Sequence, residues 1–100
     1  MNEYIVRDGA LKLVADNSDI DKAVQWTALL IEDLCAELGC EAEVEAAGAS
    51  VAARVGGKDA SIWIPVEETR DAEGVLHRRA ALDQNGLETL AYGLVDSLLF

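Results

Sequence analysis

The sequence has few of the residue types on which metal sites, disulfide frameworks and catalysis depend. Its 100 residues include two cysteines, Cys35 and Cys40, and a single histidine, His77. Two thiols and one imidazole cannot complete a tetrahedral zinc site within one chain, so we expect no metal and no cofactor. We interpret both cysteines as small apolar residues, because disulfides are rare in a reducing compartment.

Long apolar runs and a leader-like N-terminus are also absent. No apolar run approaches the ~20 residues that a membrane helix needs. The first residues, MNEYIVRDG, lack the basic start, apolar middle and cleavage site of a secretory signal. We therefore expect a cytoplasmic protein with no membrane partner. Half of the residues are apolar (51%), the balance of one folded domain spanning residues 1–100.

Catalytic motifs are missing as well. No serine lies in a nucleophile elbow, no glycine-rich loop opens a helix, and the acids lack the spacing of a calcium loop. The lone His77 lies between Leu76 and Arg78 in a predicted strand. We expect the neighbouring arginines to disfavour its charged form and interpret it as an edge histidine without a catalytic role. The sequence therefore predicts a protein that is not an enzyme.

Basic residues are scarce, and the acids are unevenly spread. Eight Lys and Arg stand against 19 Asp and Glu, a net charge of −11. Residues 16–45 hold nine acids and one base, a local charge of −8. Such a field repels phosphates, so we expect no direct binding of DNA or RNA. The natural partner is a basic protein surface.

Alternating apolar residues and turn signals predict the strands. Asp8-Gly9 and Gly56-Gly57 each join two apolar-rich runs and favour two-residue hairpins. A third hairpin is expected to join residues 66–70 to residues 75–82, with Trp63 before it facing away from the core. The expected cross-strand pairs are Tyr4–Leu13, Val6–Leu11, Ile5–Lys12, Val51–Ile62, Ala53–Ala60 and Arg54–Asp59, with Glu67 and Glu68 opposite Arg78 and Arg79.

Apolar residues at i, i+3 and i+4 spacing predict two helices. The first is expected to have Ser18 as its N-cap and to stop at Gly39. The second is expected to begin at an N-cap pair formed by Asn85 and Glu88. Both helices would cover one face of an antiparallel sheet. The predicted fold is a two-layer α+β domain with the element order ββ-α-ββββ-α.

The first predicted helix places two large apolar residues on its charged side. At about 100° per residue, Trp26 and Leu29 lie opposite the apolar stripe, among Glu32, Asp33 and Glu37. An aromatic anchor within a polar rim is typical of an interface, either with another protein or with a second copy of this chain in a homodimer, and acids in the rim select a basic partner. The alternative is that the N-terminal hairpin or a loop covers Trp26 and makes it part of the core.

The strand predicted at residues 41–46 continues the acidic region. Its glutamates alternate with apolar residues, so they would stand in a row ~6.8 Å apart, a length scale similar to that of nucleic-acid phosphates. The alternative is a solvated outer face that guards an edge strand. The candidate partner-binding residues are Trp26, Leu29, Glu32, Asp33, Glu37, Glu41, Glu43 and Glu45.

The dense carboxylates of DLCAELGCEAEVEA and the pair Trp26 and Leu29 resemble the small acidic proteins that phages encode against host nucleic-acid machinery, the anti-CRISPR proteins among them. The resemblance implies an inhibitor in the host bacterial cytoplasm. It would occupy a basic nucleic-acid-binding surface of a defence complex, such as a CRISPR-Cas surveillance complex. These proteins share no motif, so no residue role is carried over. Two alternatives stay open: an acidic chaperone or immunity protein for a basic effector or toxin, often homodimeric, and a structural subunit of a phage or bacterial assembly.

Overall fold

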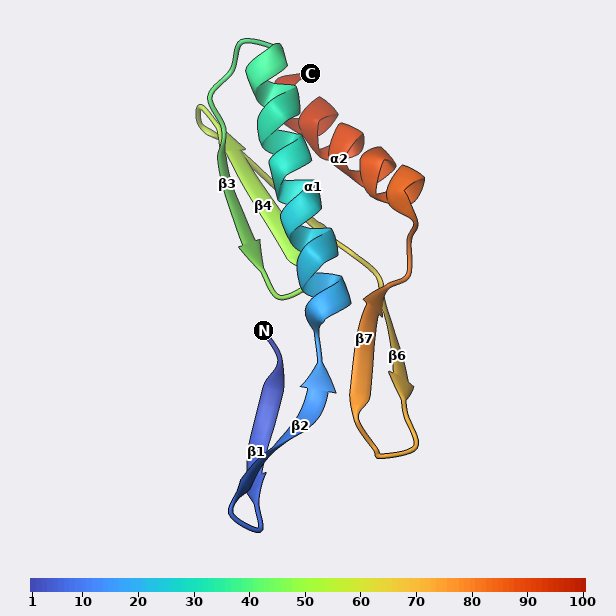
Figure 1. The fold of residues 1–100 in the computed structure, drawn as a ribbon. Helices are drawn as coiled ribbons and strands as arrows, with labels where there is room; N and C mark the ends of the chain where they lie inside the picture. The colour runs from blue at the N-terminus through green and yellow to red at the C-terminus, as the bar shows by residue number, and fades with distance from the viewer.

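Two helices and seven strands form an elongated body in the computed structural model, which describes residues 1–100 (Figure 1). Its principal extents are 54 × 24 × 17 Å. The α+β class and the element order are confirmed, with one more strand between the helices than the expected order contains. The elements are β1 (Glu3–Arg7), β2 (Ala10–Asp16), α1 (Ser18–Glu37), β3 (Glu43–Ala47), β4 (Ser50–Val55), β5 (Lys58–Trp63), β6 (Val66–Arg70), β7 (Leu76–Ala80) and α2 (Gln84–Leu99).

The seven strands form two sheets. A three-stranded antiparallel sheet, β3-β4-β5, has both helices packed on one face, as expected for a two-layer domain (Figure 1). The second sheet has the order β1-β2-β7-β6 and extends from the helices as two hairpins (Figure 1). Its central pair, β2 and β7, is parallel and joins only Ala15 to Leu76 and Asp16 to His77. The strands therefore do not share one antiparallel sheet.

The core lies between the three-stranded sheet and the helices. Ile31 of α1, Val51 of β4 and Ile64 after β5 are among the largest fully buried side chains. Thr27 is also fully buried, and its hydroxyl donates a hydrogen bond to the Ala23 carbonyl at 2.8 Å. This bond offsets the cost of burying the hydroxyl. The buried apolar residues of α2 are Leu87, Ala91, Leu94, Val95 and Leu98.

The predicted hairpin registers are confirmed. Asp8 and Gly9 both have positive φ, 52° and 76°, as a two-residue hairpin turn requires. The N-terminal hairpin aligns Tyr4 with Leu13. The remaining confirmed pairs are Val6–Leu11, Ile5–Lys12, Val51–Ile62, Ala53–Ala60, Arg54–Asp59, Glu67–Arg79 and Glu68–Arg78.

Both predicted N-caps are wrong by one or two residues. Ser18 is the first helical residue of α1, and Asn17 holds the N-cap position without a side-chain hydrogen bond. In α2 the N-cap is Asp83, whose carboxylate accepts a hydrogen bond from the Gly86 backbone N–H at 2.9 Å. Asn85 lies inside the first turn of α2, so it cannot cap that helix. The predicted end of the first helix at Gly39, which has φ of 76°, is confirmed.

Candidate protein-binding surface

The second half of α1 and the start of β3 form one acidic region. Glu32 of α1 lines the same hollow as Glu41 and Glu43, and the hollow has a volume of about 480 Å³. β3 pairs only with β4, so it is an edge strand. We use the name acidic surface for Glu32, Asp33, Glu37, Glu41, Glu43 and Glu45. All six side chains are exposed.

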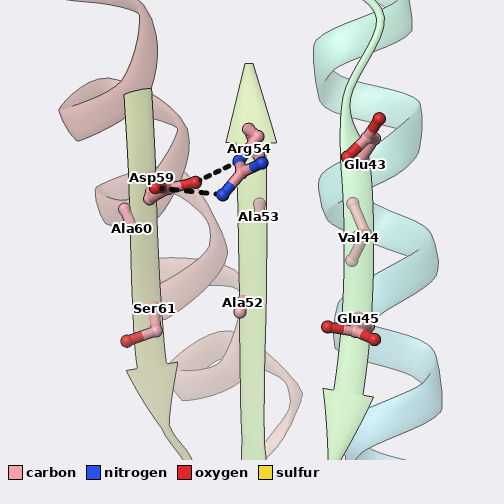
Figure 2. A pocket seen from close by; sticks show the side chains of 9 residues that line it. All are labelled: Glu43, Val44, Glu45, Ala52, Ala53, Arg54, Asp59, Ala60 and Ser61. Carbon is pink, nitrogen blue, oxygen red and sulfur yellow. Dashed lines mark hydrogen bonds and ion pairs between the residues drawn. The ribbon is translucent and has the colours of Figure 1, made fainter. Parts of the chain in front are cut away.

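The acidic surface differs in one detail from the predicted row of three glutamates. β3 begins at Glu43, and Glu41 precedes it in the connection from α1. Glu43 and Glu45 stand on the face of the sheet that points away from the helices (Figure 2). Glu41 and Glu43 reach toward α1 as well, because both line the hollow that Glu32 borders. The carboxylates therefore wrap around the edge of the sheet instead of following one straight line.

A second hollow of about 680 Å³ lies on this outer sheet face (Figure 2). Its floor is low because Ala52 and Ser61 have small side chains, and Glu43 and Glu45 border it along β3. Trp63, at the end of β5, points outward as expected and is 72% exposed. We did not select Trp63 as a candidate from the sequence. Its signal was the alternation with Ile62 and Ile64, which places it on the solvent side of the sheet.

None of the six carboxylates of the acidic surface forms an ion pair within the chain. The six acids that do so lie elsewhere: Glu3, Asp16, Asp21, Asp59, Glu68 and Asp71. Arg54 is the base beside Glu43, and it pairs with Asp59 across β4 and β5 (Figure 2). The hydrogen bond to Asp59 raises the pKa of Arg54, and the bond from Arg54 lowers the pKa of Asp59. The acidic surface thus gathers six of the acids that form no ion pair within the chain, and the other acids without one lie outside it.

The two apolar candidates on α1 differ in exposure. Leu29 is 59% exposed, so it is an apolar side chain in water beside the acids. Trp26 is only partly exposed and packs against the hydrophobic core. Trp26 thus contributes to packing, whereas Leu29 lies exposed on the surface of α1.

His77 lies in the second sheet, in contact with two carboxylates. Its Nε2 is 2.9 Å from Asp71 Oδ2, and its Nδ1 is 3.2 Å from Asp16 Oδ2. The hydrogen bond with Asp71, followed by that with Asp16, raises the pKa of His77. The expectation that arginines disfavour the imidazolium is therefore wrong. Arg78 points to the other side of β7, where it pairs with Glu3 and Glu68.

No family model, curated protein or solved structure matches this chain. Neither helix is long and apolar enough to cross a membrane. No three side chains among His, Cys, Asp and Glu are grouped so that they could hold a metal ion. The features that bear on function are the acidic surface and the exposed apolar residues beside it.

Proposed function

We propose that this protein is a non-enzymatic binding protein whose acidic surface docks onto a basic protein surface that otherwise binds nucleic acid. The observation that supports the proposal is the gathering of six exposed carboxylates, none in an ion pair within the chain, at the second half of α1 and the start of β3. Arg54, the base beside Glu43, pairs with Asp59. Carboxylates that form no ion pair within the chain are available to the bases of a partner.

The crowding of like charges is unfavourable in the free protein and favours the binding of a basic partner. Six exposed carboxylates repel one another, and a basic partner relieves that repulsion when it binds. The same field attracts a basic partner from a distance and speeds association. Leu29, exposed on α1 near the acids, supplies apolar area that becomes buried on contact. Charge would then steer the encounter, and the apolar contact would slow dissociation.

The arrangement of the carboxylates suggests the class of partner. The carboxylates wrap around one strand edge, and a basic surface that holds phosphates attracts such a concentration of negative charge. The resemblance to anti-CRISPR proteins suggests a defence complex in the bacterial cytoplasm as the partner. The protein would then compete with DNA or RNA for the partner without binding either.

A chaperone or immunity function is the second candidate, and the outer sheet face favours it. The hollow over Ala52 and Ser61 is open and has acids along one side. Trp63 is exposed on the same face of β5. An extended basic segment could lie in this hollow with an apolar residue against the Trp63 ring. This candidate predicts binding to an unfolded or extended basic peptide instead of a folded basic domain.

Capture from a bacterial lysate with a matched charge control tests the proposal. The immobilised protein is compared with a Glu41→Gln, Glu43→Gln, Glu45→Gln variant and with a control in which Glu67, Glu73 and Glu88 become Gln. Both variants lose three negative charges, and the control acids also form no ion pair within the chain.

The proposal expects nucleic-acid-binding proteins to be captured by the wild type and the control, lost with the first variant, and eluted by added duplex DNA. Equal capture by both variants, or capture that duplex DNA leaves unchanged, contradicts it. A mobility shift of duplex DNA by the protein alone at physiological salt also contradicts it. Capture of a single basic effector or toxin instead supports the chaperone or immunity function.

A further inference from the structure

The hairpin of β1 and β2 carries an apolar face that no part of the chain covers. Tyr4, Val6 and Leu11 are 55%, 74% and 74% exposed. They share one face of the hairpin with Leu13, because Tyr4 lies opposite Leu13 and Val6 opposite Leu11. β1 is also the outer strand of its sheet, whose order is β1-β2-β7-β6. An exposed edge with apolar side chains is a template for pairing with another strand.

The backbone of β1 has free groups at this edge. In an antiparallel pair, alternate residues direct their N–H and C=O groups toward the neighbouring strand and away from it. Arg7 and Ala10 flank the two-residue turn and face each other. By that alternation Ile5 also faces β2, while the backbone groups of Tyr4 and Val6 point to the free edge.

The side-chain order of β1 complements a second β1 that runs antiparallel to it. The strand reads Glu3, Tyr4, Ile5, Val6, Arg7. When two copies pair about an axis through Ile5, each Glu3 lies opposite the partner's Arg7, and each Tyr4 opposite the partner's Val6. Glu3 also pairs with Arg78 of its own chain, so each contact with the partner's Arg7 brings a second base to a carboxylate that already has one. The residues with outward backbone groups also face one another, so the register satisfies the charges and the hydrogen bonds together.

We propose that a second copy of this chain binds the free edge of β1, so that the two four-stranded sheets join into one across a two-fold axis. The interface is isologous, because the same strand serves both copies. Each apolar row then runs from Leu11 through Val6 to the partner's Tyr4 and the partner's Leu13. The three exposed residues of one hairpin and the half-buried Leu13 then become half of a continuous apolar face.

The charge distribution permits contact at this end of the molecule. The side chains of residues 1–15 include two acids and two bases, so the hairpin is neutral while the whole chain carries −11. The hairpin turn lies at the opposite end of the body from the C-terminal end of α1 and the start of β3 (Figure 1). Since repulsion is screened within about 10 Å at physiological salt, the two acidic surfaces do not oppose this dimer.

Sedimentation equilibrium with two charge reversals tests the pairing. Arg7→Glu and Lys12→Glu make the same charge change on the same hairpin, but only Arg7→Glu places two acids opposite each other, at both ends of the interface. We expect a wild-type mass of twice 10.7 kDa at high concentration. The dimer dissociation constant should rise at least about tenfold in Arg7→Glu and about twofold or less in Lys12→Glu. Circular dichroism verifies that both variants are folded.

Cross-linking tests the register itself. Cys40→Ser removes the accessible native thiol, and Cys35 can stay because it is buried. In this background, Ile5→Cys places two sulfurs across the axis at a separation that a disulfide can span. Arg7→Cys is the control, because its opposite residue is the partner's Glu3. We expect a covalent dimer on oxidation only from Ile5→Cys.

Three results overturn the proposal. A wild-type chain that stays at 10.7 kDa up to about 1 mM excludes self-pairing. This holds even if the edge of β1 binds a strand of another protein. Equal weakening by Arg7→Glu and Lys12→Glu, or equally fast cross-linking of Arg7→Cys and Ile5→Cys, excludes this edge and register. None of these measurements depends on the acidic surface.

Discussion

Truncation of Leu29 and of Ile31, two residues apart on α1, should separate binding from stability. Ile31 is fully buried. Replacing such a residue by alanine removes apolar contacts and leaves a cavity, which costs about 2–5 kcal/mol. A domain of this size loses about 4–8 °C of melting temperature per kcal/mol. We therefore expect Ile31→Ala to lower the melting temperature by roughly 10–30 °C.

Leu29→Ala should lower the stability of the protein much less than Ile31→Ala. Complete burial of a leucine side chain is worth about 2 kcal/mol, and Leu29 is already 59% exposed. Less than half of that free energy is at stake, and the higher helix propensity of alanine offsets a few tenths of a kcal/mol. Leu29→Ala should thus cost about 1 kcal/mol or less and shift the melting temperature by roughly 8 °C at most.

The assay is thermal unfolding by circular dichroism, followed by partner capture with the folded Leu29→Ala protein. Weaker capture at an almost unchanged melting temperature supports a contact between Leu29 and the partner. A fall of 10 °C or more for Leu29→Ala would refute the exposure argument. A melting temperature near that of the wild type for Ile31→Ala would refute the assigned orientation of α1.

Three further outcomes are expected. Trp26→Ala should lower the melting temperature by roughly 10 °C or more, because Trp26 packs against the core; a near-wild-type melt with weakened capture would instead make Trp26 part of the interface. His77→Gln should be more destabilising at pH 5 than at pH 8. Because the pKa of His77 is raised in the folded protein, its contacts stabilise the fold below its ordinary pKa of 6.5, and this contribution is lost as pH rises through the pKa of the folded state. A difference in stability that does not depend on pH would refute this role of His77. Asp83→Ala should cost about 1 kcal/mol and Asn85→Ala should cost less, as measured by urea unfolding, and the reverse order would refute the assigned cap.

The two carboxylates that contact His77 contribute to stability with the opposite dependence on pH. The pKa values of Asp16 and Asp71 are lowered from 3.8, mainly by a hydrogen bond from Ser18 and a hydrogen bond with His77, respectively. Their contribution is present above pH 3.8 and is lost as pH falls through the lowered values. The contacts between β2, β7 and the turn that precedes β7 are therefore strongest between about pH 4 and 6.5.

Local signals were sufficient to predict the hairpins. A two-residue turn leaves only one register, so Asp8-Gly9 and Gly56-Gly57 determined the predicted pairs of their hairpins. The turn did not determine the register shift between Glu3 and Tyr4, which places Glu3 opposite Ala15. The predicted cap at Asn85 failed for a different reason. Asp83 and Asn85 are both good capping residues, and only the position of the Gly86 N–H in the folded chain decides between them.

The division into two sheets could not be predicted in the same way. The parallel contact between β2 and β7 joins residues 61 positions apart and comprises only two residue pairs. It is reinforced by Asp16 and Asp71 on either side of His77, and no local pattern in the sequence signals such an arrangement. The partial burial of Trp26 is equally non-local. A helical wheel gives the angle of a side chain but not how far a neighbouring element covers it.

The two proposed interfaces lie toward opposite ends of one elongated chain, and this separation has a consequence for affinity. A dimer joined at β1 would direct its two acidic surfaces outward, away from each other. A partner with two basic sites, or an array of basic subunits, would then be held by both copies, and the second contact would form at a high effective concentration. A partner with one site would gain nothing from dimerisation. Comparing the wild type with Arg7→Glu, which leaves the acidic surface unchanged, therefore shows whether binding requires one copy or two.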